Sequence, residues 1–143
     1  MEKRFEFLDH VADAYVVAYG KTLEEAFQNA ALAMFELMTD TRKVVPQTED
    51  KIVVEEWDQK ALLYSWLEQL LLKFEIYGRL YSRFKISELV RTEKGWRLRA
   101  IASGEPFNRS KHESKAEIKA VTYHQMEIMR KDEGYAVKFI LDL

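Results

Sequence analysis

A wide apolar stripe in residues 59–78, QKALLYSWLEQLLLKFEIYG, limits the folds open to this chain. Its large apolar residues recur at helical spacing, which places them along one broad face of a helix: Leu62, Leu63, Trp66, Leu67, Leu70, Leu71 and Phe74. Asp58 can cap the first turn, and Gly78 suits the helix end. So broad an apolar face has to be covered, and we expect this helix to lie deepest in the core.

A second helix is predicted over residues 21–40, because Thr22 and Glu25 have capping-box spacing and apolar residues follow at helical intervals. Seven other segments alternate as strands do: RFEFLDH, AYVVAYG, KIVVEEW, LYSRFKISELV, WRLRAIASG, AEIKAVTYHQMEIMR and YAVKFILDL. We therefore expect an α+β fold, with two helices packed on a mixed or antiparallel sheet of about six or seven strands. The sequence contains no repeat or linker, so residues 1–143 are expected to form a single domain.

Composition narrows the classes of function. The chain has 22 basic and 24 acidic residues and a net charge of −2, which disfavours binding to nucleic acid on its own. It has no cysteine, so thiolate chemistry and cysteine-ligated zinc are excluded. No signal peptide or membrane-length apolar run is present, and we expect a cytoplasmic protein without membrane contact.

Three polar residues, Asp9, His10 and Asp13, interrupt the apolar stretch FLDHVADAYVVAYG. One interpretation is local: a carboxylate caps a turn between two strands, and His10 is a partly buried side chain with a hydrogen-bond partner. The other is an oxygen-rich cation site that is completed from elsewhere in the fold.

The end of the sequence offers further oxygen ligands. Asp142 directly precedes Leu143, so a side-chain carboxylate stands beside a main-chain carboxylate and the two charges repel. A bound cation would relieve that repulsion, whereas the alternative is a solvated tail.

Two further candidates are Lys119 and His124 in KAEIKAVTYHQM. Lys119 lies between small and apolar neighbours, which would aim it at an anion, although such a lysine also reaches solvent from a half-buried strand. His124 beside Tyr123 could form an acid–base pair, but a structural hydrogen bond is the preferred interpretation. The basic residues of the segment NRSKHESK are expected to form a solvated loop. No motif combines a nucleophile with its base.

Taken together, DHVADA, GKTLEEAFQNAALAMFELMTD, LLYSWLEQLLLKFE, EIKAVTYHQM and the final ILDL resemble the archease family in the same order over nearly the whole chain. Family members commonly read D-H-T-A-D and V-K-A-[VI]-T-Y. Val11 and Ile118 depart from these patterns without removing a charged group.

The resemblance implies an accessory protein that is not itself an enzyme. Archeases activate the RtcB-type RNA ligase of tRNA splicing by promoting its guanylylation and its multiple turnover, and they are also described as chaperone-like. The ligase is therefore the expected partner, and RNA is contacted only through it. The oligomeric state stays open.

By position, the resemblance implies a metal site formed by Asp13, Asp142 and Leu143, with Ca²⁺ as the expected ion and Mg²⁺ or Mn²⁺ as alternatives. It also implies a functional lysine at Lys119, while Asp9 and His10 are expected to support the site. Two other classes remain open. One is a metal-dependent phosphodiester hydrolase built on Asp9, His10, Asp13 and His124. The other is an RNA-binding chaperone that uses the basic residues Arg109, Lys111, Lys115 and Lys119.

Overall fold

The computed structural model describes residues 3–8 and 13–143. Within these ranges it contains two long helices, seven strands and a short 3-10 turn at Thr41–Lys43. The helices are α1 (Leu23–Met38) and α2 (Gln59–Tyr77). The strands are β1 (Phe5–Leu8), β2 (Asp13–Gly20), β3 (Thr48–Glu56), β4 (Arg79–Thr92), β5 (Gly95–Pro106), β6 (Ala120–Lys131) and β7 (Gly134–Asp142).

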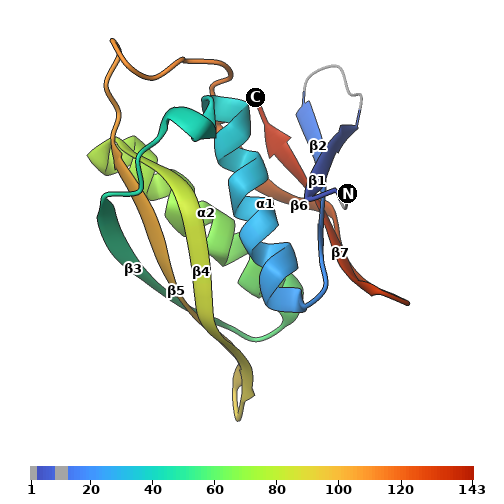
Figure 1. Ribbon diagram of the computed structural model, residues 1–143. Coiled ribbons are helices and arrows are strands. Elements are labelled where there is room, and N and C mark those ends of the chain that lie inside the picture. Colours follow the sequence, from blue (N-terminus) through green and yellow to red (C-terminus); the bar gives the residue numbers. More distant parts are fainter. Residues whose placement is uncertain (1–2, 9–12) are drawn as a thin grey trace.

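The strands form two antiparallel sheets. Sheet A has the order β1-β2-β7-β6 and sheet B the order β3-β5-β4. The two helices lie between the sheets (Figure 1). Helix α1 contacts β2 and β7 of sheet A and β4 of sheet B, whereas α2 contacts β6 of sheet A and all three strands of sheet B. Both helices and both sheets therefore contribute to one hydrophobic core.

Polar contacts fix α1 within this arrangement. The buried indole N–H of Trp66 in α2 donates to the carbonyl of Phe27 in α1 at 2.9 Å. The amide of Asn29 donates to the carbonyl of Tyr19 in β2 at 2.6 Å. Because these donors are wholly or largely buried, each bond satisfies a group that would otherwise be costly to remove from water.

The expectation that residues 59–78 lie deepest in the core is wrong, because α1 is the more buried helix. Its buried face includes four alanines, Ala26, Ala30, Ala31 and Ala33, and these small side chains let both sheets approach closely. In α2 the bulky residues face the core, while Leu72, Ile76 and Tyr77 remain exposed.

The predicted α+β class with two helices and about seven strands is confirmed. The strands divide between two sheets, where one sheet was expected. The strand predicted from residue 116 begins only at Ala120. The reason is that the N–H groups of Lys115 and Ala116 donate to the carbonyls of Met38 and Leu37, so this segment satisfies the end of α1.

Candidate functional site

Asp13 and Asp142 lie directly opposite each other on neighbouring antiparallel strands. Asp13 is the first residue of β2, Asp142 is the last of β7, and the two are Cα partners. Directly opposite residues present their side chains on the same face, with Cβ atoms about 4.5–5.5 Å apart. Both residues are half-buried. The structure therefore brings together two carboxylates from opposite ends of the sequence.

Lys119 reaches the same corner through its main chain. Its N–H donates to the carbonyl of Asp142 at 2.7 Å, and the next residue, Ala120, pairs with Asp142 on the β6 side. The residue itself is exposed. Leu143 follows Asp142 directly, and its half-buried side chain packs against the core. In Figure 1 the C-terminus lies beside the segment that leads into β6.

Asp9 and His10 lie outside the described residues. Across residues 3–8 and 13–143, no group of three or more His, Asp or Glu side chains could hold a metal ion. The described chain thus offers two side-chain carboxylates at this corner, together with the main-chain oxygens of Leu143.

His124 does not form the expected structural hydrogen bond to any described residue. It lies in a wide bulge of β6, because Thr122 pairs with Ile140 and Glu127 pairs with Lys138. Residues 123–126 therefore oppose Phe139 alone. The bulge leaves His124 exposed and holds Gln125 at a φ of 56°. Regular alternation in the sequence gave no signal of this irregularity.

The basic segment 109–115 is largely neutralised within the fold. Lys111 donates to Glu105 at 2.6 Å, and Lys115 donates to Glu36 at 2.8 Å. His112 is fully buried, donates to Glu105 at 2.9 Å through Nε2, and accepts the N–H of Asn108 through Nδ1. The segment is thus an anchored connection, whereas sequence analysis expected a solvated loop.

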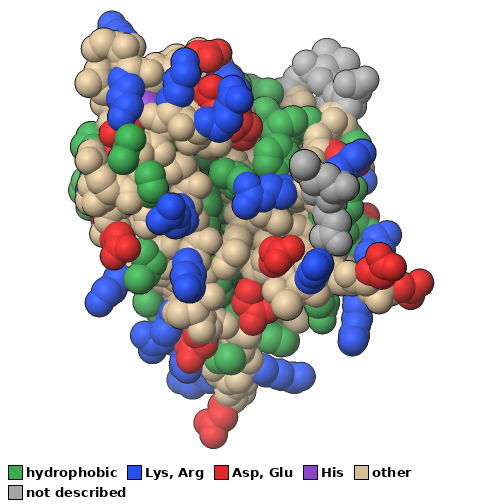
Figure 2. All heavy atoms as spheres, viewed as in Figure 1, with side chains coloured by type: hydrophobic (Ala, Val, Ile, Leu, Met, Phe, Trp, Pro, Cys, Tyr) green, Lys and Arg blue, Asp and Glu red, His purple; other side chains and the backbone are tan. Residues whose placement is uncertain are grey.

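Glu105 is the acceptor at the centre of this anchor. Burial favours its neutral form, but hydrogen bonds from Lys111, the Val45 N–H and His112 outweigh that effect and lower its pKa to about 2. Elsewhere, the basic and acidic side chains of the described residues are interspersed over the face shown in Figure 2. These residues therefore form no broad basic area for RNA on that face.

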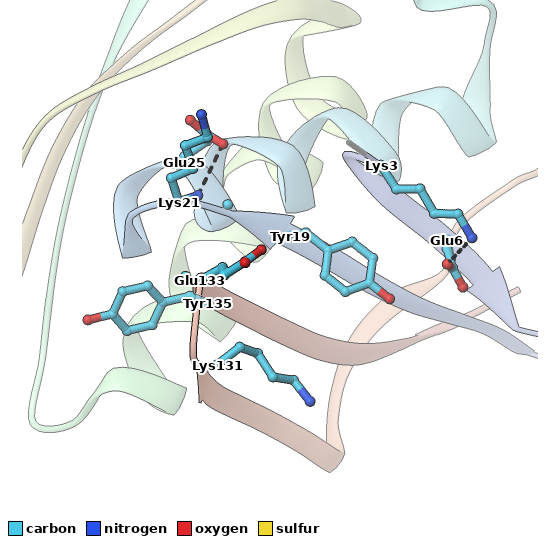
Figure 3. Close-up of a pocket in the computed structure, with 10 residues that line it drawn as sticks. Lys3, Glu6, Tyr19, Lys21, Glu25, Lys131, Glu133 and Tyr135 are labelled. Carbon is cyan, nitrogen blue, oxygen red and sulfur yellow. Dashed lines mark hydrogen bonds and ion pairs between the residues drawn. The ribbon is translucent and has the colours of Figure 1, made fainter. Parts of the chain in front are cut away.

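A cavity of about 390 Å³ lies at the other end of sheet A. Figure 3 shows Tyr19, Lys21, Glu25, Glu133 and Tyr135 around it. The cavity is far from the carboxylate pair, because β2 and β7 extend from Asp13–Asp142 to Gly20–Tyr135, seven residues or about 23 Å away. Its lysines and glutamates balance in charge, so it favours no ligand of one sign.

Comparison with known proteins assigns the family. The model of the Archease protein family (MTH1598/TM1083) matches residues 5–143. The chain is 44% identical to the archease of Sulfolobus acidocaldarius over 140 residues, covering 98% of this chain and 99% of that protein. It is also 44% identical to the archease of Thermococcus gammatolerans over 142 residues, covering 99% of each.

Solved structures agree with this assignment. The solution structure of protein 1598 from Methanobacterium thermoautotrophicum has a TM-score of 0.85, is 42% identical, and matches over 98% of this chain and 99% of that one. A Thermotoga maritima archease, described as a possible chaperone, shares the fold with a TM-score of 0.63 at 20% identity, over 100% of this chain and 98% of that one. The chain belongs to the archease family. In the described residues, no helix is long and apolar enough to cross a membrane.

Proposed function

We propose that this protein is a non-catalytic accessory factor that activates an RtcB-type RNA ligase in tRNA splicing and holds a divalent cation between Asp13 and Asp142. Membership of the archease family supports the choice of partner. The single observation that carries the choice of residues is the direct pairing of Asp13 with Asp142 at the end of sheet A.

The chemistry of this corner fits a hard divalent cation. Like charges placed directly opposite each other on neighbouring strands destabilise a sheet, and a bound cation offsets that repulsion. The available donors are all oxygens: the two carboxylates and the main-chain carboxylate or carbonyl of Leu143. Ca²⁺ prefers such a set, and Mg²⁺ or Mn²⁺ can also use it. Remaining positions would be filled by water or by groups of the ligase.

Lys119 supplies the positive charge of the proposed site. Its backbone is fixed to β7 by the hydrogen bond to the carbonyl of Asp142, while the residue is exposed. An ammonium anchored in this way can meet a phosphate group that the ligase presents. The bound cation would add charge neutralisation at the same place. Positioning and charge stabilisation dominate nucleotidyl transfer, so a second protein can contribute without a nucleophile of its own.

In this proposal, bond making and breaking stay with the ligase, and RNA is contacted through the ligase. The pairing of Lys111 and Lys115 with glutamates supports this division, because these cations are already neutralised within the fold. Asp9 and His10, which lie outside the described residues, keep their proposed supporting role.

The test is multiple-turnover RNA joining by the cognate ligase, with and without this protein. Wild-type protein is expected to raise turnover, whereas Asp13→Asn and Asp142→Asn are expected to remove most of the stimulation. Asp132→Asn is the matched control, because Asp132 is an exposed carboxylate in the turn between β6 and β7. Equal stimulation by all four proteins would exclude the carboxylate pair. Hydrolysis of phosphodiesters without ligase would favour the hydrolase alternative.

A further inference from the structure

A stacked pair of tyrosines lies on the surface where β6 meets α2. The rings of Tyr64 and Tyr123 are 4.6 Å apart between centroids and inclined by 17°. Tyr64 belongs to α2, and Tyr123 is the first residue of the β6 bulge. Tyr123 is 50% exposed, so the pair offers aromatic surface to solvent. An exposed stack fixed between two elements is a rigid contact surface for a flat group.

Three carboxylates lie near this pair. Glu68 accepts the Tyr64 hydroxyl at 2.7 Å, Glu56 accepts the hydroxyl of the neighbouring Ser65 at 2.6 Å, and Asp58 accepts the N–H of Ala61 at 2.8 Å. Each of these bonds uses one carboxylate oxygen. Among the described residues, no Lys or Arg forms an ion pair with any of the three.

The nearby carboxylates help to raise the pKa of both tyrosine hydroxyls. The hydrogen bond to Glu68, followed by burial, raises the pKa of Tyr64. Burial, followed by the charges of Asp58 and Glu56, raises the pKa of Tyr123. Asp58 and Glu56 therefore both act electrostatically on Tyr123, the half-exposed tyrosine of the pair.

The aromatic stack and the three carboxylates together indicate which kind of ligand this surface favours. A single-stranded RNA would stack on the rings, but its phosphates would meet three carboxylates, so RNA is disfavoured. A metal ion is disfavoured as well, since no group of three such side chains in the described ranges is close enough to hold one. A guanidinium group fits both features, because it stacks flat on aromatic rings and donates hydrogen bonds to carboxylates.

We infer that Tyr64 and Tyr123, with Glu56, Asp58 and Glu68, form an arginine-docking surface for an exposed segment of a protein partner. The inference rests on the proposed function where it names the ligase as that partner. The surface suits that role by its place: Tyr123 follows Ala120, the partner of Asp142, by three residues, or about 10 Å along β6. A partner held here would lie at the same end of sheet A as the carboxylate pair.

The first test does not involve the ligase. The isotope-labelled protein is titrated with the peptide acetyl-GRGRGRG-amide, and the ring signals of Tyr64 and Tyr123 are followed by NMR. We expect saturable shifts at these rings, weaker binding of the lysine analogue acetyl-GKGKGKG-amide, and about a fivefold loss of arginine-peptide affinity in Tyr123→Ala. Tyr77→Ala is the control, because Tyr77 is 69% exposed at the far end of α2. Unshifted rings, or equal affinity in Tyr123→Ala, would overturn the inference.

The second test measures ligase affinity and ligase stimulation in parallel. Tyr123→Ala is expected to weaken ligase binding at least about fivefold, and Tyr77→Ala to leave it unchanged. If wild-type protein stimulates the ligase and Tyr123→Ala binds it equally well, the docking surface is wrong and the proposed function stands. If wild-type protein neither binds nor stimulates the ligase, the proposed function fails. In that case the peptide titration, which does not involve the ligase, still tests whether the docking surface binds arginine.

Discussion

Asp13 and Asp142 are partners in the β2–β7 ladder, so the pairing of two strands sets the spacing of the proposed cation ligands. Seven further residue pairs continue this ladder, from Ala14–Leu141 to Gly20–Tyr135. A register slip of one residue would move one carboxylate to the other face of the sheet. The buried residues Val16 and Phe139, which pair with each other within the ladder, oppose such a slip.

Cation binding at this corner should be visible as stabilisation. At a Ca²⁺ concentration one hundred times Kd, the folded state gains about 2.7 kcal/mol, which corresponds to a rise in Tm of about 5 °C or more. The measurement is thermal unfolding in Ca²⁺ and in EDTA. Asp142→Asn should lose the Ca²⁺-dependent rise, and Asp132→Asn should keep it. An equal rise in Asp142→Asn would place the cation elsewhere.

Replacing Lys119 should separate cation binding from activation. Lys119→Met keeps the main-chain N–H that donates to Asp142, so the Ca²⁺-dependent change in Tm should persist. Stimulation of RNA joining should fall at least about tenfold if an ammonium must meet a phosphate there. Lys131→Met, at the other end of β6, is the control. Full stimulation by Lys119→Met would remove this lysine from the site.

Because the pKa of Glu105 is lowered in the folded protein, we expect the protein to lose stability in acid. This pKa is about 2 in the folded protein against an ordinary 4.5, so the unfolded state binds the proton first as pH falls. The stabilisation is therefore complete above about pH 4.5 and is lost between there and about pH 2. Urea unfolding across this range should show a smaller pH-dependent change in the unfolding free energy for Glu105→Gln than for wild type. Parallel curves for the two proteins would contradict the assignment.

Trp66 should be important for stability and Trp57 should not. Trp66→Phe removes the donor to the buried Phe27 carbonyl and leaves a void, which should cost about 2–4 kcal/mol of unfolding free energy. Trp57 is 76% exposed, so Trp57→Phe should change stability by less than about 0.5 kcal/mol. Urea unfolding of the two variants measures the difference. Similar losses would mean that the helix–helix contact is not as described.

Gln125 adopts a φ of 56°, a conformation that glycine tolerates better. Gln125→Gly should therefore stabilise the protein, by about 0.5–1 kcal/mol. Gln69→Gly, on the exposed face of α2, should instead destabilise it by about 1 kcal/mol. Chemical denaturation of both variants tests the pair. Destabilisation by Gln125→Gly would show that the glutamine side chain itself supports the bulge.

Much of the fold was predictable because its signals are local. The caps at Thr22 and Asp58 and the left-handed Gly78 lie where sequence analysis expected them. The relative burial of the two helices could not be predicted from local signals, because it depends on how closely the two sheets approach α1. The alanines of α1 make a close approach possible, but they do not by themselves indicate it. The division of strands between two sheets likewise depends on pairings between distant segments.

The site shows the same limit. Each acid could be picked out along the sequence, but only the family resemblance implied that Asp13 and Asp142 share a site, because spacing alone did not pair them. The β2–β7 register places the two residues opposite each other. The Tyr64–Tyr123 stack was missed, because one ring lies on a helix and the other on a bulge that alternation does not reveal. His112 was assigned to a solvated loop, since its burial depends on Glu105, which lies on a different element.

The measurement that tests the central claim most directly is the rate of ligase guanylylation from GTP in a single turnover, with wild-type protein, Asp142→Asn or Asp132→Asn added. The account predicts acceleration by wild type and Asp132→Asn, and a rate with Asp142→Asn close to that of the ligase alone. Equal acceleration by all three proteins would contradict it, because the carboxylate pair would then have no part in activation.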